Sequence, residues 1–338
     1  MKYIATRKSI PFMQSAWQAE LADSFTHPAD LLDFLELDPS EIPLAPSAAL
    51  GFPFLVTRSY AARMSKRDPR DPLLRQVLPL SVESLDTPGY TGDPVGDLQS
   101  MAGGGVLHKY QGRVLLLTTG ACAIHCRYCF RREFPYQQHP LGKSKERESL
   151  EYIASDPSIH EVILSGGDPL VLNDTRLADL IEGIAFIPHV QRLRFHTRVP
   201  IVLPSRITPE LVKNLSSIRL CVVVVIHANH PAELDPSVDC ALKHLRMADV
   251  RLLNQAVLLK DVNDDLATLN RLSEALFEGG VLPYYLHLLD KARGTAHFEV
   301  EESTARRLLY QMRSSLPGYL VPKLVREIAG EACKRMIA

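Results

Sequence analysis

The chain has 338 residues, with 38 lysines and arginines against 39 aspartates and glutamates, and a formal net charge of -1. This balance excludes the bulk electrostatic attraction that binding to nucleic acid or to an acidic membrane surface requires. A hydrophobic content of 46% with 23% charged residues is ordinary for a globular protein and excludes disorder over most of the chain. At about 150 residues per domain, the length suggests two domains, or one large core with an added segment.

The first part of the chain has the pattern of short helices joined by prolines. Amphipathic stretches at 17–25 and 29–37 precede Pro39, Pro43 and Pro53. Residues 1–105 are therefore expected to form a mainly helical N-terminal segment.

Two features of the apolar pattern bear on location. Charged and polar residues interrupt the first stretch, so the N-terminus lacks the apolar core of a secretory signal. The longest apolar run, at 220–226, is much shorter than the about 20 residues that span a bilayer. We expect a cytoplasmic protein that has no membrane partner.

From residue 114 onwards, short β-branched or leucine-rich runs alternate with amphipathic segments. Six runs are predicted to be strands, at 114–119, 161–165, 192–197, 220–227, 251–259 and 283–290. Their starts lie roughly 30 to 50 residues apart, which is the spacing of strands that are each followed by a crossover helix. Helices are expected at 175–186 with Asp174 as its cap, from Thr208-Pro209 onwards, and at 266–277 after Asp265.

Six strand–helix units predict a parallel sheet that curls into a barrel. A complete eight-stranded barrel takes about 250 residues, more than remain after residue 114, so an open six-stranded partial barrel is expected over 106–300. Residues 301–338 are expected to add a C-terminal helix and a short extension. Chemistry in such folds sits at the carboxyl ends of the strands, and the unusual residues of this chain follow those ends.

Three of the six cysteines, Cys122, Cys126 and Cys129, stand together after the first predicted strand. This grouping is not a disulfide framework, and soft thiolates select iron–sulfur clusters, zinc or copper(I). A structural zinc site needs a fourth ligand, and no second Cys or His pair is spaced to supply it. A four-iron cluster on three thiolates leaves one iron open to bind a small molecule, which makes the cluster a reaction centre. A zinc- or cluster-binding interaction protein stays open as the non-enzymatic alternative.

The cysteine spacing, with Tyr128 directly before the last cysteine, resembles the radical S-adenosylmethionine (SAM) superfamily. The resemblance implies the partial barrel, a [4Fe-4S] cluster whose open iron binds SAM, and a reductant of the flavodoxin or ferredoxin type. The segment Ser165-Gly166-Gly167-Asp168 then resembles the glycine-rich element beside SAM, although a Gly-Gly after a strand is also an ordinary tight turn. Two further candidates for the SAM pocket are His196 and Gln255, each of which can equally be a hydrogen-bonded structural residue.

Longer segments, among them CRYCFRREFPY, RLRFHTRVPIVLPSRIT and PYYLHLLDKARGTAHF, closely resemble the lysine 2,3-aminomutase family from about residue 70 to the end. The compact length most resembles the short bacterial form that makes (R)-β-lysine for the modification of elongation factor P. This resemblance implies an isomerase that acts on L-lysine with pyridoxal 5′-phosphate (PLP). It also implies a downstream elongation factor P lysylating ligase as a partner, and it is compatible with a homo-oligomer. A catabolic lysine or other amino-acid 2,3-aminomutase, and a radical SAM protein modifier without PLP, are the enzymatic alternatives.

The resemblance places the covalent PLP lysine at Lys334. The sequence departs from the family here, because no proline follows the lysine and the preceding glycine stretch is reduced to Gly330. Lys323 is therefore a competing candidate, and Lys334 can also be read as a solvated lysine.

The remaining implied residues bind the two ends of the amino acid and the phosphate of PLP. Arg131 matches the family position for the α-carboxylate, with Arg132 as its rival, and a guanidinium can clamp a carboxylate with two hydrogen bonds. Asp290 and Glu327 match the positions for the distant ammonium, although surface salt bridges would also explain either acid. Lys109 and Arg113 are the implied phosphate ligands, and a pair of solvated cations is the alternative.

Overall fold

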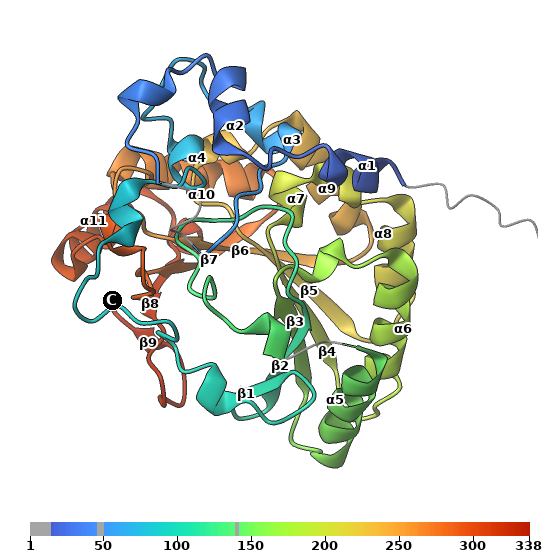
Figure 1. The fold of residues 1–338 in the computed structure, drawn as a ribbon. Helices are drawn as coiled ribbons and strands as arrows, with labels where there is room; N and C mark the ends of the chain where they lie inside the picture. The colour runs from blue at the N-terminus through green and yellow to red at the C-terminus, as the bar shows by residue number, and fades with distance from the viewer. Residues whose placement is uncertain (1–14, 46–50, 139–141) are drawn as a thin grey trace, which may run out of the picture.

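A nine-stranded sheet organises the protein (Figure 1). The computed structural model describes residues 15–45, 51–138 and 142–338. The strands lie side by side in chain order, and all neighbours from β2 to β8 are parallel, whereas β1 and β9 pair antiparallel at the two edges. The strands are β1 (Val106–Tyr110), β2 (Arg113–Thr119), β3 (Glu161–Gly166), β4 (Arg192–Thr197), β5 (Cys221–Ile226), β6 (Arg251–Val257), β7 (Leu282–His287), β8 (Lys323–Arg326) and β9 (Arg335–Met336).

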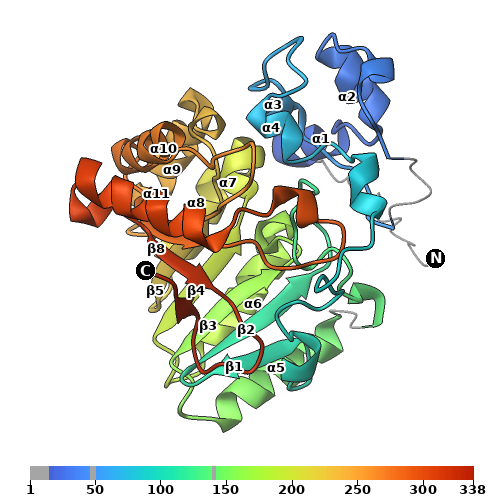
Figure 2. The ribbon, with the colours of Figure 1, turned by 90° about the vertical axis from the view of Figure 1, so that its left-hand side faces the viewer.

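One helix or helix pair follows each of the strands β2 to β7 and packs on the outer face of the curved sheet (Figures 1 and 2). These are α5 (Lys143–Ser155), α6 (Asp174–Ala185), α7 (Val199–Val202) with α8 (Pro209–Ser216), α9 (Pro236–Met247), α10 (Leu266–Glu278) and α11 (Glu302–Ser315). Four short helices of the N-terminal segment lie together over one end of the barrel in Figure 2, namely α1 (Ala16–Ala22), α2 (Pro28–Phe34), α3 (Arg58–Ala61) and α4 (Pro72–Arg75).

Burial follows the sequence pattern in both kinds of element. Residues of β4 and β6 alternate between buried and more exposed positions, as one side chain in two points into the core. Helix α6 buries Leu177, Leu180, Ile181 and Ile184, which are spaced to form one apolar stripe against the sheet. The Thr208 and Asp265 side chains accept hydrogen bonds from the backbone N–H groups at the starts of α8 and α10, as predicted.

The predicted open partial barrel is confirmed, and its six strands are β2 to β7 with ends shifted by a few residues. The sheet is larger than predicted, because β8 adds a seventh parallel strand and β1 and β9 extend the edges. These three strands are short or lie at an edge, so they lack the long apolar run that marks the others. One predicted cap was wrong: Asn173 caps α6, and Asp174 is its first residue.

The residues that the structure describes include no helix that is long and apolar enough to cross a membrane.

Candidate active site

The cysteine loop follows β2 at the carboxyl end of the parallel strands. Burial and the neighbouring Cys129 thiol raise the pKa of Cys122 well above its usual value, and burial with Cys126 raises the pKa of Cys129 to about 11. Mutual electrostatic effects of this kind mean that the three thiols lie close to one another in a poorly solvated place. Thiols there lose their protons readily only when a cation compensates the charge, as bound iron does.

A single metal ion and an iron–sulfur cluster require different arrangements of their ligands. Among residues 15–45, 51–138 and 142–338, no three His, Cys, Asp or Glu side chains converge on one metal-ion position. A zinc ion needs all its ligands at about 2.0–2.3 Å from one point. An iron–sulfur cluster instead binds its cysteines through different irons, so its ligands stand further apart.

The N-terminal segment holds the cysteine loop in place. The backbone N–H groups of His125 and Arg127 donate to the carbonyl oxygens of Leu55 and Gln76, at 2.9 and 2.8 Å. The Arg127 guanidinium is fully buried and donates to both carboxylate oxygens of Glu83, at distances from 2.6 to 3.1 Å. The loop therefore acquires its shape from residues that precede it by more than forty positions.

The glycine-rich element at the end of β3 packs directly on the cysteine loop. Gly167 N–H donates to Thr119 O at 2.6 Å, and Asp168 N–H donates to Ala121 O at 2.8 Å. A Cβ atom on Gly166, whose φ is +128°, would stand 2.4 Å from Thr119 O, and one on Gly167 would stand 2.0 Å from Ala121 O. Both glycines are thus required for the close approach of the two loops.

Ser165 and Asp168, predicted to bind SAM, have polar partners within the protein. The Ser165 hydroxyl accepts from Arg131 Nη1 at 3.2 Å. The buried Asp168 carboxylate accepts from the Thr197 hydroxyl and from the backbone N–H groups of Leu170, Arg198 and Val199. Asp168 therefore ties the end of β3 to the end of β4, and its hydrogen-bonding capacity is largely used.

Three histidines lie in the barrel interior: His287 is buried, and His196 and His227 are partly buried. Burial lowers the pKa of His227 to about 3 and the pKa values of the other two well below the usual range, so all three are neutral. Gln255 Nε2 lies 2.8 Å from His227 Nε2. The Nε2 atoms of His196 and His287 have no hydrogen-bond partner in the part of the chain that the structure describes, which leaves capacity for a bound molecule.

A second group of charged residues joins the two edges of the sheet. Arg131 Nε lies 2.6 Å from Asp97 Oδ2, and Lys109 Nζ lies 2.5 Å from Asp97 Oδ1 and 3.0 Å from Glu327 Oε1. Lys109 is on β1 and Glu327 directly follows β8, so this chain of ion pairs crosses from one edge strand region to the other. We call Asp97, Lys109, Arg131, Glu327 and Lys334 the edge network.

Lys334 enters the edge network through the antiparallel pairing of β8 with β9. Val325 pairs with Met336 and Arg326 with Arg335, so the chain returns and the Lys334 ammonium forms an ion pair with Glu327 Oε2. Burial alone would raise the pKa of Glu327, but the ammonium groups of Lys334 and Lys109 outweigh it and lower the pKa to about 2. The carboxylate is thus ionised at any physiological pH.

Asp290, at the carboxyl end of β7, lies beside the edge network and has unused hydrogen-bonding capacity. Burial and the nearby Glu327 carboxylate raise its pKa to about 7, although Lys334 and Lys109 act in the opposite direction. Its Oδ1 atom is buried and has no hydrogen-bond partner among the residues that the structure describes. A buried carboxylate oxygen without a donor favours a bound cation or hydrogen-bond donor at this point.

The rival candidates lie elsewhere. Arg132 pairs with Glu83 at 2.7 Å and donates to the Gly294 carbonyl, so it belongs to the packing of the N-terminal segment. Lys323 is exposed at the start of β8. Arg113, implied as a phosphate ligand, is not one of these rivals, and its guanidinium lies 4.6 Å from the centroid of the Tyr110 ring at the start of β2.

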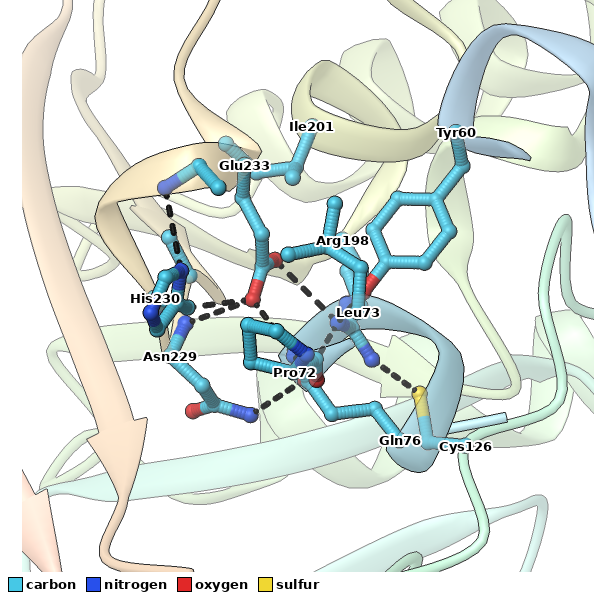
Figure 3. Close-up of polar contacts among 12 residues, drawn as sticks. Tyr60, Pro72, Leu73, Gln76, Cys126, Arg198, Ile201, Asn229, His230 and Glu233 are labelled. Atoms are coloured by element: carbon cyan, nitrogen blue, oxygen red, sulfur yellow. Dashed lines mark hydrogen bonds and ion pairs between the residues drawn. The ribbon is translucent and has the colours of Figure 1, made fainter. Parts of the chain in front are cut away.

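Sequence reasoning missed several residues of the site. Asp97 links Arg131 to Lys109, and Gln76, Tyr60 and Glu233 contact the side chain of Arg198 beside Cys126 (Figure 3). None of them stands in a motif or at the end of a strand. The one available indication was Arg198 itself, which directly follows β4.

Comparisons with known proteins define the class. Residues 116–266 match the model of the radical SAM superfamily. The match contains the cysteine loop, the glycine-rich element and strands β3 to β6. The protein is a radical SAM enzyme, and the class implies a [4Fe-4S] cluster and SAM, which the grouped thiols and the unpartnered imidazoles fit.

Individual relatives identify the family within this superfamily. An L-lysine 2,3-aminomutase of Escherichia coli (strain K12) is 48% identical over 319 residues, which cover 94% of this chain and 93% of that protein. Its counterpart in Haemophilus influenzae is 44% identical, covering 95% of both chains. An L-lysine 2,3-aminomutase of Acetoanaerobium sticklandii is 32% identical, covering 93% of this chain and 76% of the longer relative. The chain belongs to the lysine 2,3-aminomutase family and is an isomerase.

Proposed function

We propose that this enzyme uses PLP as a second cofactor and moves the α-amino group of L-lysine to the β-carbon. The observation that carries the proposal is the edge network, which gathers a guanidinium, two ammonium groups and two carboxylates next to Asp290 and the cysteine loop. Lysine carries the complementary groups, namely a carboxylate at one end and an ammonium at the other. When bound, the cluster and SAM supply a hydrogen-abstracting radical, and PLP supplies the carrier on which the amino group moves.

The residues at the ammonium end fit this substrate. Glu327 already accepts two ammonium groups of the protein itself, those of Lys109 and Lys334. Lys334 is the residue that would hold PLP covalently, and its Nζ would then no longer be a free ammonium partner of Glu327 Oε2. Glu327 would then need another ammonium partner, and Asp290 Oδ1 offers a second acceptor beside it.

At the opposite end, Arg131 is the proposed ligand of the α-carboxylate. It is nearly buried, so a charged hydrogen bond to a carboxylate would be strong there. Asp97 holds the guanidinium from one side and Ser165 from another, which fixes its direction. Lys109 is proposed to contact the PLP phosphate with Arg113, and Ser165, Gly166 and Gly167 to contact SAM together with His196 and Gln255. Asp168 is proposed to shape that SAM element from behind.

The proposal is tested by anaerobic turnover. The protein is reconstituted with iron and sulfide, supplied with SAM, PLP, dithionite and L-lysine, and the products are separated by mass spectrometry after derivatisation. β-Lysine is the expected product, and chiral separation gives its configuration. A panel of other α-amino acids tests the alternative of a different aminomutase. A cluster that cleaves SAM without any β-amino acid would contradict the proposal.

We further propose that the product is (R)-β-lysine destined for elongation factor P, with a flavodoxin- or ferredoxin-type reductant and the elongation factor P lysylating ligase as partners. The support is the near-complete coverage of the short relatives, against 76% of the longer one. Deleting the gene should leave elongation factor P without the modification, as its intact mass would reveal. Supplying (R)-β-lysine in the medium should restore it. An unchanged mass in the deletion strain would reject this role.

A further inference from the structure

One cluster ligand has a cationic neighbour that follows β4, two strands away from β2 in the sheet. Arg198 Nη1 lies 2.6 Å from Cys126 Sγ and 2.7 Å from the Tyr128 hydroxyl, as Figure 3 illustrates for the thiol. Arg198 follows β4 and is only 5% exposed, whereas Cys126 precedes it by 72 positions. The guanidinium therefore meets the sulfur in a place from which water is largely excluded.

A buried set of polar residues fixes the direction of this guanidinium. Arg198 Nη2 donates to Gln76 Oε1 at 2.7 Å, to Glu233 Oε2 at 3.1 Å and to the Tyr60 hydroxyl at 3.1 Å. The other Glu233 oxygen accepts from Gln76 Nε2 and from the backbone N–H groups of Asn229 and His230. Rotation of the guanidinium would break several of these bonds at once.

The charges in this set balance before the sulfur is counted, so a charged sulfur makes the set negative. Arg198 carries one positive charge and its carboxylate partner Glu233 one negative charge, and both are buried. A thiolate at Cys126 adds a second negative partner for the same guanidinium. Because the effective dielectric constant in such a place is low, the guanidinium acts strongly on the charge of the sulfur and of any cluster bound to it.

We propose that Arg198 is a positioning residue that raises the reduction potential of the [4Fe-4S] cluster through a charged hydrogen bond to Cys126 Sγ. One-electron reduction adds a negative charge to the cluster, and a nearby cation with an N–H group aimed at the sulfur stabilises that more negative state. Glu233 opposes the effect, because its carboxylate offsets part of the Arg198 charge. The inference rests on the cluster that the family implies, and not on PLP or on the identity of the substrate.

The test is a redox titration of the reconstituted holoenzyme without SAM, followed by the electron paramagnetic resonance signal of the reduced cluster. At the potential where the wild type is half reduced, Arg198→Met should lower the ratio of reduced to oxidised cluster about tenfold, which corresponds to about 59 mV for a one-electron couple. Arg198→Lys keeps the positive charge but loses the planar guanidinium with its several N–H donors. Its ratio of reduced to oxidised cluster should lie between those of the wild type and Arg198→Met. Glu233→Gln should raise the ratio.

The Arg198 and Glu233 variants are expected to shift the reduction potential in opposite directions, which a merely structural role would not produce. Arg206→Met is the matched control, because Arg206 is equally buried but contacts Asp174, the backbone of Leu170 and Leu172, and the Trp17 ring. It should leave the potential unchanged. If Arg198→Met fails to bind iron, Arg198→Lys should still lower the reduction potential and Glu233→Gln should still raise it.

Equal potentials in the wild type and in the Arg198 and Glu233 variants, at equal iron content, would overturn the proposal. So would a change in SAM affinity alone, measured by the change in the resonance signal on SAM addition. A wild type that forms no cluster would instead contradict the radical chemistry of the proposed function.

Discussion

The cluster end and the substrate end of the site are built differently. At the cluster end, both oxygens of each of Glu83, Asp168 and Glu233 accept hydrogen bonds from the protein. At the substrate end, Asp290 Oδ1 and His287 Nε2 have no hydrogen-bond partner within residues 15–45, 51–138 and 142–338, and ion pairs connect the residues of the edge network. Saturated groups fix a geometry, whereas ion pairs and unpartnered groups can exchange partners with a ligand. Substitutions should accordingly disturb assembly at the cluster end and affinity at the substrate end.

The largest effect is expected from the cluster ligands. Replacing Cys122, Cys126 or Cys129 by alanine removes one of three thiolates, so cluster iron and all turnover should be lost. Iron and sulfide analysis with the visible absorbance of the cluster measures this. Cys221→Ala is the matched control, because Cys221 is also partly buried but accepts a hydrogen bond from Arg251 at the other end of the strands. Equal iron in both variants would contradict the cysteine assignment.

The corresponding residue of the substrate end is Lys334. Lys334→Ala should abolish the absorbance band of enzyme-bound PLP and reduce turnover to background, while cluster content stays at the wild-type level. Lys323→Ala should keep the band, because Lys323 is exposed at the start of β8. Loss of the band in the Lys323 variant instead would reassign the PLP lysine.

Glu83 tests whether the cluster end depends on the N-terminal segment. Glu83→Gln leaves the buried Arg127 and Arg132 guanidinium groups without their carboxylate. Breaking a buried ion pair in this way costs about 3–5 kcal/mol of folding free energy, which denaturant unfolding measures. Glu36→Gln removes a carboxylate that also pairs with two cations, Lys66 and Arg67, but at the exposed surface, so its stability should match the wild type. If both variants lost the same free energy of unfolding, the buried ion pairs of Glu83 would contribute no more than the exposed ones of Glu36, which would contradict the prediction.

Glu327 tests affinity at the substrate end. On the proposed role, Glu327→Gln removes a charged hydrogen bond to the substrate ammonium, worth about 1.5–3 kcal/mol, so the KM for lysine should rise about tenfold to a hundredfold. Stability should fall as well, because the change also breaks the ion pairs with Lys109 and Lys334. Initial rates at saturating PLP measure the change. Glu302→Gln, which removes an exposed carboxylate paired with Arg306 and Arg326, should leave KM unaltered. A fall in kcat at constant KM would assign Glu327 a role other than substrate binding.

Local patterns predicted the parts of the site that lie within one segment. The cysteine spacing and the strand periods placed Cys122, Gly166 and Asp290 at or just after the carboxyl ends of strands, where the structure has them, because each placement depends on neighbours in sequence. The sequence could not predict the network around Arg198, since Gln76 and Glu233 stand 157 positions apart. Their pairing depends on how the N-terminal segment packs over the barrel.

The short strands β8 and β9 likewise could not be predicted from local sequence patterns. β9 has two residues and β8 has four, too few for a hydrophobic period, yet their pairing brings Lys334 to Glu327. Resemblance to a family supplied the role expected of Lys334, and the antiparallel return of the chain is what places it among charged groups. Asp97, between short turns, had no local pattern that distinguishes it from a surface acid.

The smallest expected effect is the pH dependence that Asp290 gives to the KM for lysine, and the direction of this dependence follows from the raised pKa. With a pKa of about 7 in place of the usual 3.8, its carboxyl is mostly protonated at pH 6 and ionised at pH 8. An ionised carboxylate binds the substrate ammonium better, so the KM for lysine should fall, by no more than about tenfold, as the pH rises from 6 to 8. Asp290→Asn should flatten this dependence.

Stability without substrate should respond in the opposite direction. Because the folded state binds the Asp290 proton more tightly than the unfolded state, this group stabilises the fold below about pH 4 and loses that contribution as the pH rises towards 7. Relative to Asp290→Asn, the wild type should therefore become less stable over the interval in which its affinity for lysine begins to improve. Urea unfolding at several pH values, set beside KM over the same range, measures both. A wild type whose stability and KM change with pH no more than those of Asp290→Asn would mean that Asp290 is ionised throughout, held by a cation of the edge network.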